Sequence, residues 1–454
     1  AGELQENLIA HLSSGVGAAL SRTHTRATMA ARISALAKGK SGVSPAALDL
    51  LLRCLNADAI PVVPSMGTVG ASGDLTPLAH IAGALMGRGE IRLGAGPARP
   101  AAEVLREIGM PPFAPGGKDA LALVNGTSAM TGIAGINGGA AARALRWSAL
   151  LSAGHAAVLE ARAEAWDAAF GELRPHPGQQ HLHRWLNRLV QAGDRAKAGD
   201  EGVDPDAIRY LDAPVQDAYS LRCAPQLLGA VSDQIEWHNQ IVQTELNSVT
   251  DNPVLPDERD RVLHGGNFYG QHVAFASDAL ANALITMAVH AERRIAQICH
   301  PRLNRGLPAF LQAEKIGLQS GFMGAQVTAS ALLAEMRTKA IPASIQSIPT
   351  NGDNQDVVPM GTIGARRCAE LLDLLNLLLA IDALVVAQAL DLRTEDAPGK
   401  SFSEAILALR DWVRAEAPRL NKDRALSKEI QQIAEKMAAP ATLPDRMPCF
   451  DCGH

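Results

Sequence analysis

Five long stretches of this chain are rich in alanine and leucine, nearly free of proline, and continuous enough to be helices. They cover residues 127–166, 221–250, 267–300, 321–340 and 361–392. Each is longer than the usual globular helix of about 11–12 residues. Helices of this length are stable when they pack against one another along most of their faces. The sequence therefore predicts a mainly α fold built on a central bundle of long helices.

In the N-terminal part, glycine and proline interrupt the helical pattern more often. Shorter helices are expected over residues 4–12 and 18–37, with Gly39 ending the second, and Ser44-Pro45 opens a third. Residues 87–115 are rich in glycine and proline, which predicts loops with short strands around residues 91–93. We divide the chain into an N-terminal domain (residues 1–120), the central long-helix bundle (121–395) and a C-terminal helical segment with a tail (396–454).

Composition excludes several classes of function. A formal charge of -5 without a basic cluster argues against a nucleic-acid partner. No apolar run is expected to span a membrane and no signal peptide is recognised, so we expect a cytoplasmic protein. Six scattered cysteines show no disulfide spacing, which fits a reducing compartment. Cys449, Cys452 and His454 lack the second pair that a zinc site needs, and Gly94-x-Gly96 lacks a nucleotide-binding context, so neither metal nor nucleotide is expected.

The stretch Gly67–Pro77 reads G-T-V-G-A-S-G-D-L-T-P, and we expect a helix to start there with Thr76 as N-cap and Pro77 in its first turn. Its small residues permit a reaction within the chain. The amide nitrogen of Gly73, unobstructed by a side chain, can attack the carbonyl of Ala71 and close a five-membered ring. Loss of the Ser72 hydroxyl as water would leave an electrophilic methylidene group. A helix N-terminus alongside would favour electron density arriving there.

This eleven-residue run resembles that of the aromatic amino acid ammonia-lyases, the family of histidine, phenylalanine and tyrosine ammonia-lyases and related aminomutases. For A-S-G alone, an ordinary turn before a helix is the alternative. The resemblance implies a methylidene-imidazolone group (MIO) formed from Ala71, Ser72 and Gly73. It also implies a fold of the fumarase/aspartase-like superfamily and a homotetramer with shared active sites. It extends from residue 4 to about residue 392 and is weak beyond.

Further motifs resemble blocks of the same family. In Q-D-A-Y-S-L-R-C-A-P-Q, the resemblance assigns Arg222 to the substrate carboxylate and Tyr219 to positioning or proton transfer. A planar guanidinium suits a carboxylate, and the same charge is unfavourable at a helix start, which favours a functional role. In L-V-N-G-T-S-A-M, Asn125 resembles the asparagine that hydrogen-bonds the MIO carbonyl and the substrate carboxylate. Its local alternative is a helix N-cap.

The resemblance also assigns supporting residues around the MIO. Asp74 follows the ring-forming residues, and Asn252 lies in a T-D-N-P turn where an Asx-turn is the local alternative. Residues 264–268 and 320–326 match family blocks that line the same region. We expect the last two blocks to approach the site without assigning them individual roles.

Two positions bear on the choice of amino acid. The pair His11-Leu12 resembles the selectivity position of tyrosine ammonia-lyases, where phenylalanine enzymes tend to carry Phe-Leu and histidine enzymes Ser-His. His11 could hydrogen-bond a phenol hydroxyl while Leu12 and Leu75 contact the ring. A site that pairs a hydroxyl can reject an analogue lacking it by about 10⁴–10⁵-fold. Tyrosine is therefore the predicted substrate.

The second position is Gln355, in N-G-D-N-Q-D-V-V. Histidine-using relatives carry glutamate at the matching position, where an anion suits an imidazole. A neutral amide suits a phenyl or phenol ring, and Asn354 beside it could reach the end of the ring. Histidine is therefore disfavoured as a substrate.

One family feature is missing from the sequence. The catalytic base of these enzymes is a tyrosine beside a T-T-G-F-G-like motif, before the position that matches His11, and none of the three tyrosines here lies in such a motif. The opening residues resemble the middle of a protein, so we expect a longer molecule that supplies this loop. A chain without it is expected to have little or no lyase activity.

We therefore predict an ammonia-lyase that converts L-tyrosine to trans-p-coumarate, as in phenylpropanoid metabolism. Phenylalanine deamination and tyrosine 2,3-aminomutase activity are alternatives that use the same chemistry. A non-catalytic helical homologue that serves in assembly is the alternative of another class. The active sites are expected to be shared, with Tyr219 and Arg222 from one neighbouring subunit and the Gln355 region from another.

Overall fold

The structure, a computed structural model, describes residues 2–191, 216–257, 261–314, 317–396, 402–440 and 450. The polar stretch 192–205, whose composition favours a loop, lies outside these residues, as do Tyr210 and the Cys449, Cys452 and His454 group. The fold is mostly helical, with 62% helix and 6% strand, as the proline-free stretches predict. The chain groups into two compact units that share the long helices.

Four long helices carry the chain between the units. They are α7 (Ser128–Val158), α11 (Ala224–Leu246), α12 (Gln271–Cys299) and α14 (Gly361–Asp396). Each lies within or close to its predicted stretch. The stretch 127–166 ends earlier as an α-helix and continues as the 3-10 turn η1 (Ala163–Trp166), and the stretch 221–250 begins as a separate short helix, α10 (Tyr219–Arg222).

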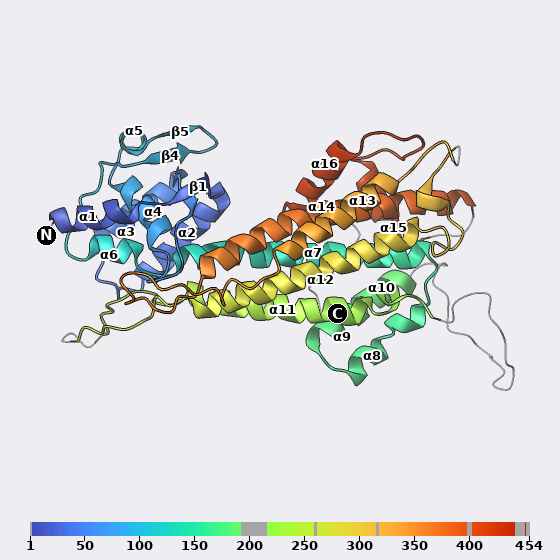
Figure 1. Cartoon of the computed structure of the whole chain (residues 1–454), viewed down its shortest axis with the longest axis horizontal. Coiled ribbons are helices and arrows are strands. Elements are labelled where there is room, and N and C mark those ends of the chain that lie inside the picture. Colours follow the sequence, from blue (N-terminus) through green and yellow to red (C-terminus); the bar gives the residue numbers. More distant parts are fainter. Residues whose placement is uncertain are drawn as a thin grey trace. The chain divides into compact units, whose positions relative to one another are not determined.

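Unit 1 comprises residues 1–139, 237–281 and 341–370. Besides the parts of the long helices that it includes, its elements are α1 (Gly2–Leu12), β1 (Val16–Ala19), α2 (Arg22–Leu36), α3 (Pro45–Asn56), β2 (Ala59–Pro61), β3 (Pro64–Met66), α4 (Leu75–Leu85), β4 (Glu90–Leu93), β5 (Ala98–Pro100), α5 (Ala101–Glu107) and α6 (Asp119–Val124). These elements, drawn in blue and cyan in Figure 1, share one apolar core to which β2 and β4 also contribute buried side chains.

Two small antiparallel sheets flank this core. One pairs β1 with β3, and the other has the order β2-β4-β5. The strand at β1 corrects the expected helix 18–37, because the helix begins only at Arg22, where the Ser21 side chain accepts a hydrogen bond from the His24 amide. Helix α5 was also not predicted within the glycine- and proline-rich segment.

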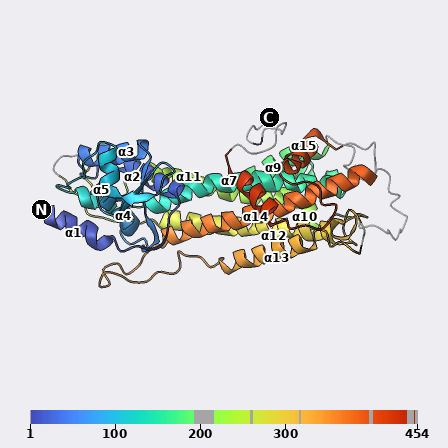
Figure 2. The same cartoon turned by 90° about the horizontal axis from the view of Figure 1, so that it is seen from above.

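Unit 2 comprises residues 140–236, 282–340 and 371–454. Besides its share of the long helices, η1 and α10, its elements are α8 (Ala168–Leu173), α9 (Pro177–Gln191), η2 (Ala309–Leu311), α13 (Met323–Thr338), α15 (Glu404–Arg414) and α16 (Ser427–Ala438). Helix α9 begins at Pro177, because proline is favoured in the first turn of a helix. Helices α7, α12 and α14 lie side by side in unit 2 (Figure 2).

A buried ion-pair network joins these three helices. Arg294 of α12 donates to Asp382 of α14 at 2.5 Å and to Ser152 of α7 at 2.8 Å, and Asp382 also contacts His155 of α7 at 2.5 Å. All four side chains are buried. Removing one partner from such a network leaves an uncompensated buried charge, so the network fixes how the helices pack.

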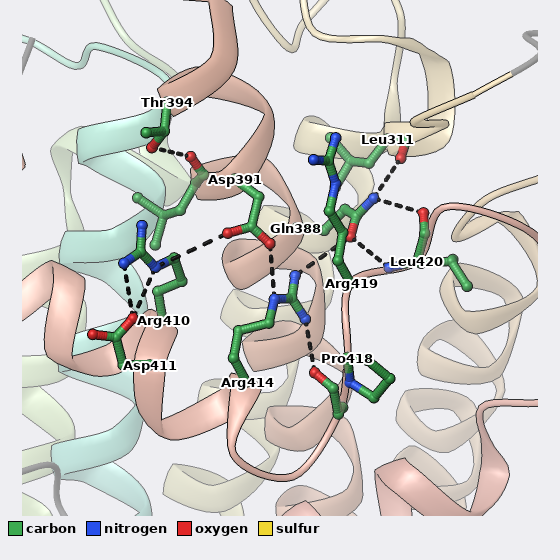
Figure 3. Close-up of polar contacts among 12 residues, drawn as sticks. Leu311, Gln388, Asp391, Thr394, Arg410, Asp411, Arg414, Pro418, Arg419 and Leu420 are labelled. Carbon is green, nitrogen blue, oxygen red and sulfur yellow. Dashed lines mark hydrogen bonds and ion pairs between the residues drawn. The ribbon is translucent and has the colours of Figure 1, made fainter. Parts of the chain in front are cut away.

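A second polar cluster attaches α15 and the segment after it to α14 (Figure 3). Gln388, fully buried on α14, donates to the carbonyls of Leu311 and Leu420 and accepts from the amide of Leu420. Arg414 of α15 donates to Asp391 at 2.8 Å and to Gln388 at 3.4 Å. One amide side chain thus satisfies backbone groups of two loops that would otherwise be buried unpaired.

Helix α12 corrects the expectation that no apolar run reaches membrane-spanning length. Its most apolar window has a mean hydropathy of 1.4, and within the described residues it is the helix that is long and apolar enough to cross a bilayer. However, 61% of that window is buried inside the protein. A surface already covered by other helices offers little to lipid, so α12 is a core helix in this fold.

Candidate active site

The three ring-forming residues predicted from the sequence lie in a tight turn of unit 1. The Gly73 amide donates to the Gly70 carbonyl at 3.1 Å, and Ser72 and Gly73 both have positive φ, at 53° and 75°. A methyl group at Gly73 would lie 2.2 Å from the Gly126 carbonyl oxygen. Only glycine fits there, because any side chain would collide with that backbone.

Residues just before α7 hold this turn from one side. The Gly126 amide donates to the Ser72 carbonyl at 3.2 Å, and the Asp74 amide donates to the Gly126 carbonyl at 2.8 Å. These two bonds form a short parallel bridge between Gly73 and Gly126. Gly73 is therefore held on both flanks by one neighbouring residue, Gly126.

A second segment reaches the turn from residues 350–360. The Gln355 amide donates to the Ser72 hydroxyl at 3.4 Å, and Thr350 donates to the Gln355 side-chain oxygen at 2.8 Å. Farther on, the Met360 amide donates to the Val69 carbonyl at 3.0 Å. The expectation that the Gln355 region comes from another subunit is therefore wrong, because Gln355 of the same chain contacts Ser72.

Asp74 links this turn to the starts of three helices. It is fully buried at the N-cap of α4, its carboxylate accepts from the Met130 amide in the first turn of α7 at 2.7 Å, and it pairs with the Thr362 hydroxyl at the start of α14. Burial raises the pKa of Asp74 to about 6, although Thr362 and the Met130 amide oppose the rise. Helix N-termini carry positive partial charge, which partly offsets the cost of burying the charged form of Asp74.

The predicted helix start is corrected by the same contacts. The helix begins at Leu75 with Asp74 as N-cap, two residues earlier than the Thr76–Pro77 start expected from the sequence. The Thr76 hydroxyl instead donates to the Gly67 carbonyl at 2.9 Å. The Asp74 carboxylate does not cap α4 itself, because it bonds to the first turns of α7 and α14.

A buried cation beneath the turn was not predicted. Arg32 of α2 is 1% exposed, and its Nη1 donates to the Asn125 carbonyl at 2.8 Å. Burial lowers the pKa of Arg32 to about 10, while the charges of Asp251 and Asp74 oppose this. The available signal was an arginine three residues after Met29 and four before Leu36, on the apolar face of a predicted helix.

Asn125 is fully engaged with the same region. Its side-chain amide nitrogen donates to Asp251 at 2.8 Å and to the Asn252 carbonyl at 2.9 Å, and Asp251 also pairs with Lys118 at 2.6 Å. Both amide protons are used, so donation to a substrate from this nitrogen requires a change of partner. Asn125 is the C-cap of α6 and not the N-cap that was its local alternative.

The remaining predicted residues of unit 1 are near the ends of its elements. Asn252 accepts from the Gly265 amide at 2.6 Å, which orders the start of the 264–268 block. His11 is exposed at the end of α1, whereas Leu12 and Leu75 are half-buried against the core. Asn354 is exposed, with its backbone amide bonded to the Asn351 carbonyl at 3.3 Å.

Tyr219 and Arg222 belong to unit 2. They lie on α10, where the Arg222 guanidinium stacks over the Tyr219 ring at 4.6 Å. Arg222 lines a cavity of about 330 Å³ with Arg162, Asp217 and Phe170. The 320–326 block also lies in unit 2, where the amides of Ser320 and Gly321 donate to Asp423. Unit 1 thus brings together Ala71–Gly73, Asp74, Asn125 and Gln355. Tyr219, Arg222 and the 320–326 block belong to unit 2.

Three comparisons place the chain among known proteins. Residues 1–415 match the family model of aromatic amino acid lyases. A tyrosine ammonia-lyase of Cereibacter sphaeroides is 50% identical over 445 residues, which are 95% of this chain and 83% of the relative. A histidine ammonia-lyase of Gloeobacter violaceus is 42% identical over 440 residues, 96% of this chain and 82% of the relative.

The fold is similar to that of a solved relative. The crystal structure of a tyrosine aminomutase from Streptomyces globisporus matches with a TM-score of 0.89 at 37% identity, over 96% of this chain and 83% of that chain. This confirms the predicted mainly α, long-helix architecture.

Proposed function

Because this chain belongs to the aromatic amino acid lyase family, we propose that it removes ammonia from L-tyrosine without oxidation and releases trans-p-coumarate. The observation that carries this proposal is the Ala71-Ser72-Gly73 turn, held against Gly126 and beside the buried Asp74. The choice of tyrosine rests on the pair His11-Leu12 and on 50% identity to a tyrosine ammonia-lyase.

The proposed cofactor is an MIO made from this turn, and the residues present fit it. Gly73 has no Cβ where none would fit, and Ser72 has the positive φ of a tight turn. Ring closure forms a bond from Gly73 N to the Ala71 carbonyl carbon, and the Ala71 oxygen leaves as water with one proton from each of the Gly73 and Ser72 nitrogens. The Ser72 hydroxyl then leaves as water with the Ser72 α-proton. Once present, the group supplies an electrophilic carbon for the substrate's amino group.

His11 is proposed to recognise the phenol. Its Nδ1 lies 3.0 Å from the Asn7 carbonyl, which can only accept, so Nδ1 carries the proton and Nε2 is left as an acceptor. A phenol hydroxyl can donate to that nitrogen, whereas phenylalanine has no such donor. Leu12 and Leu75 would contact the ring from their half-buried positions.

Arg222 is proposed to bind the substrate carboxylate and Tyr219 to position the substrate or transfer a proton. Tyr219 is 71% exposed on its own chain, which suits a residue that completes a site shared between subunits. We also propose a homotetramer in the cytoplasm. Four large apolar side chains in residues 341–357 support assembly, because they are 59–69% exposed and contact with a neighbour would cover them: Ile341, Ile345, Ile348 and Val357.

The deciding experiment incubates the complete protein with tyrosine, phenylalanine and histidine in turn and follows the absorbance of each acrylate. We expect tyrosine to give the highest kcat/KM, and a preference for histidine or phenylalanine would contradict the role of His11. His11→Phe should shift the preference between tyrosine and phenylalanine by about 10–100-fold toward phenylalanine. His176→Phe, at an exposed histidine of unit 2, is the matched control and should leave the preference unchanged.

A tyrosine aminomutase is a second candidate, because the solved tyrosine aminomutase has a very similar fold. Product analysis separates the two activities, since a β-tyrosine product would identify the mutase. A non-catalytic homologue is separated by the intact mass, because ring formation removes two waters. An unmodified mass in the folded protein would favour the non-catalytic homologue.

A further inference from the structure

Arg32 is a buried cation whose contacts lead to Ser72 through a single peptide group. Its Nη1 donates to the Asn125 carbonyl at 2.8 Å. The nitrogen of that same peptide is the Gly126 amide, which donates to the Ser72 carbonyl oxygen at 3.2 Å. We call these atoms the Arg32 relay: Arg32 Nη1, the Asn125–Gly126 peptide and the Ser72 carbonyl oxygen.

Packing leaves little freedom along the relay. A methyl group on Gly126 would lie 2.3 Å from Arg32 Nη1 and 2.4 Å from the Thr250 carbonyl oxygen. The guanidinium and the Gly126 peptide are therefore in direct contact. A carbonyl that accepts from a cation polarises its peptide, which makes the N–H at the other end a stronger donor.

Arg32 is not explained by ordinary ion pairing. Among the described residues its Nε and Nη2 have no hydrogen-bond partner, although both are buried. Burying an incompletely paired guanidinium opposes folding, so stability alone does not account for an arginine here. Within the part of the chain that the structure describes, its one hydrogen bond is the one that leads to Ser72.

The Ser72 carbonyl oxygen is where both steps of ring formation place negative charge. Removing the proton from Gly73 N gives an anion that is shared with this oxygen, because the nitrogen and the Ser72 carbonyl form one amide. Removing the Ser72 α-proton gives an anion that is again shared with the same oxygen. A strong donor to this atom stabilises both, by the same physics as an oxyanion hole.

We propose that Arg32 is a positioning residue which, through the Asn125–Gly126 peptide, activates the Ser72 carbonyl for conversion of Ala71-Ser72-Gly73 into the MIO. This inference rests on the proposed function. It differs from the family assignments of Asn125 and Asp74, because it concerns a residue of α2 whose hydrogen bond goes to the Asn125 carbonyl.

The test measures maturation by intact mass and does not require turnover. Wild type, Arg32→Gln and Arg32→Lys are made by cell-free synthesis, and the folded fraction is isolated at intervals to follow the loss of two waters. Gln keeps an amide donor without the charge, and Lys keeps the charge. Arg294→Gln is the matched control, because Arg294 is as deeply buried as Arg32 but belongs to unit 2. Unlike Arg32, it is bonded to a carboxylate, that of Asp382.

We expect folded Arg32→Gln to mature about 10–100-fold more slowly than wild type, with partial recovery in Arg32→Lys. Arg294→Gln should lower the melting temperature at least as much but mature at the wild-type rate. If folded Arg32→Gln matures at the wild-type rate, or if Arg294→Gln matures as slowly as Arg32→Gln, the role proposed for Arg32 is wrong. If wild type never loses the waters, the proposed function itself fails.

Arg32→Lys decides the matter if Arg32→Gln does not fold. Lysine is a compact charge with a different reach, so the relay expects a folded lysine variant to mature several-fold more slowly than wild type. A time course identical to that of wild type would overturn the proposal.

Discussion

Gly73 and Gly126 lie so close that a methyl group on Gly73 would come within 2.2 Å of the Gly126 carbonyl oxygen. Their contact joins the turn at Ser72 to the segment that leads into α7. This pair and Asp74 beside it hold the ring-forming residues on the side of α7, and Gln355 holds Ser72 from another segment.

Alanine at Gly73 or Gly126 should therefore block maturation. Both glycines have positive φ, at 75° and 144°, and both would meet backbone atoms closer than real contacts allow. We expect a lower melting temperature and a folded fraction without the two-water loss, measured by intact mass. Gly116→Ala is the control, because no atom lies within 4 Å of its Cβ position. Normal maturation of Gly73→Ala would contradict the site geometry.

Asp74→Asn should change how stability depends on pH. The pKa of Asp74 is raised from 3.8 to about 6, so between these values the folded chain binds more protons than the unfolded chain. Wild-type stability should thus fall relative to the variant as pH rises from about 4 to about 6, by about 3 kcal/mol, and stay level above that. Urea unfolding at several pH values measures this. Asp49→Asn, at an exposed carboxylate of α3, should change stability by less than about 0.5 kcal/mol.

His290 should make unit 2 sensitive to acid. Its Nε2 donates to the Ser220 carbonyl of α10 at 2.7 Å, and burial and the neighbouring Arg294 lower its pKa to about 3. Below the unfolded pKa of about 6.5 the unfolded chain binds the extra proton, so stability falls as pH falls from about 6.5 toward 3. His290→Gln should remove about 1.4 kcal/mol per pH unit of this loss, measured by unfolding between pH 6.5 and 5. Equal slopes in both proteins would contradict the assignment.

Gln388→Leu should detach the segment after α15. It removes the partners of the Leu311 carbonyl and of the Leu420 amide and carbonyl (Figure 3). Each buried group left unpaired costs about 1–3 kcal/mol, so the total should be about 3 kcal/mol or more. Hydrogen exchange of residues 414–420 should rise before that of α14. Gln431→Leu, at an exposed glutamine of α16 bonded to Glu435, is the control.

The long helices were predictable because their stretches combine length, apolar content and an absence of proline. Smaller elements were not. Gly15 precedes β1 and Gly17 lies within it, yet the alanines that follow fit a helix equally well, and only pairing with β3 selects the strand. The helix start was misplaced at Thr76 because Thr-Pro is a strong local signal, whereas Asp74 is fixed by α7 and α14, far away in the sequence.

In the site, too, local sequence predicted some residues, whereas others depend on contacts between distant segments. The A-S-G-D run was recognisable from local sequence, whereas Gln355 was expected beside the substrate ring and from another subunit, and its contact with Ser72 of the same chain was not predicted. Arg32 was missed because an arginine on an apolar helix face is usually taken to reach solvent with its charged end. Here its contact with the Asn125 carbonyl depends on how α2 packs against a segment more than ninety residues later, and a single sequence does not show that packing.

Asp74 meets Thr362 across 288 residues of sequence. During synthesis on the ribosome, the Ser72 turn emerges long before Gln355 and Thr362 exist. A reactive group that needs this full enclosure would arise on finished chains and not on growing ones, which would spare the nascent polypeptide from attack by the amines and thiols around it.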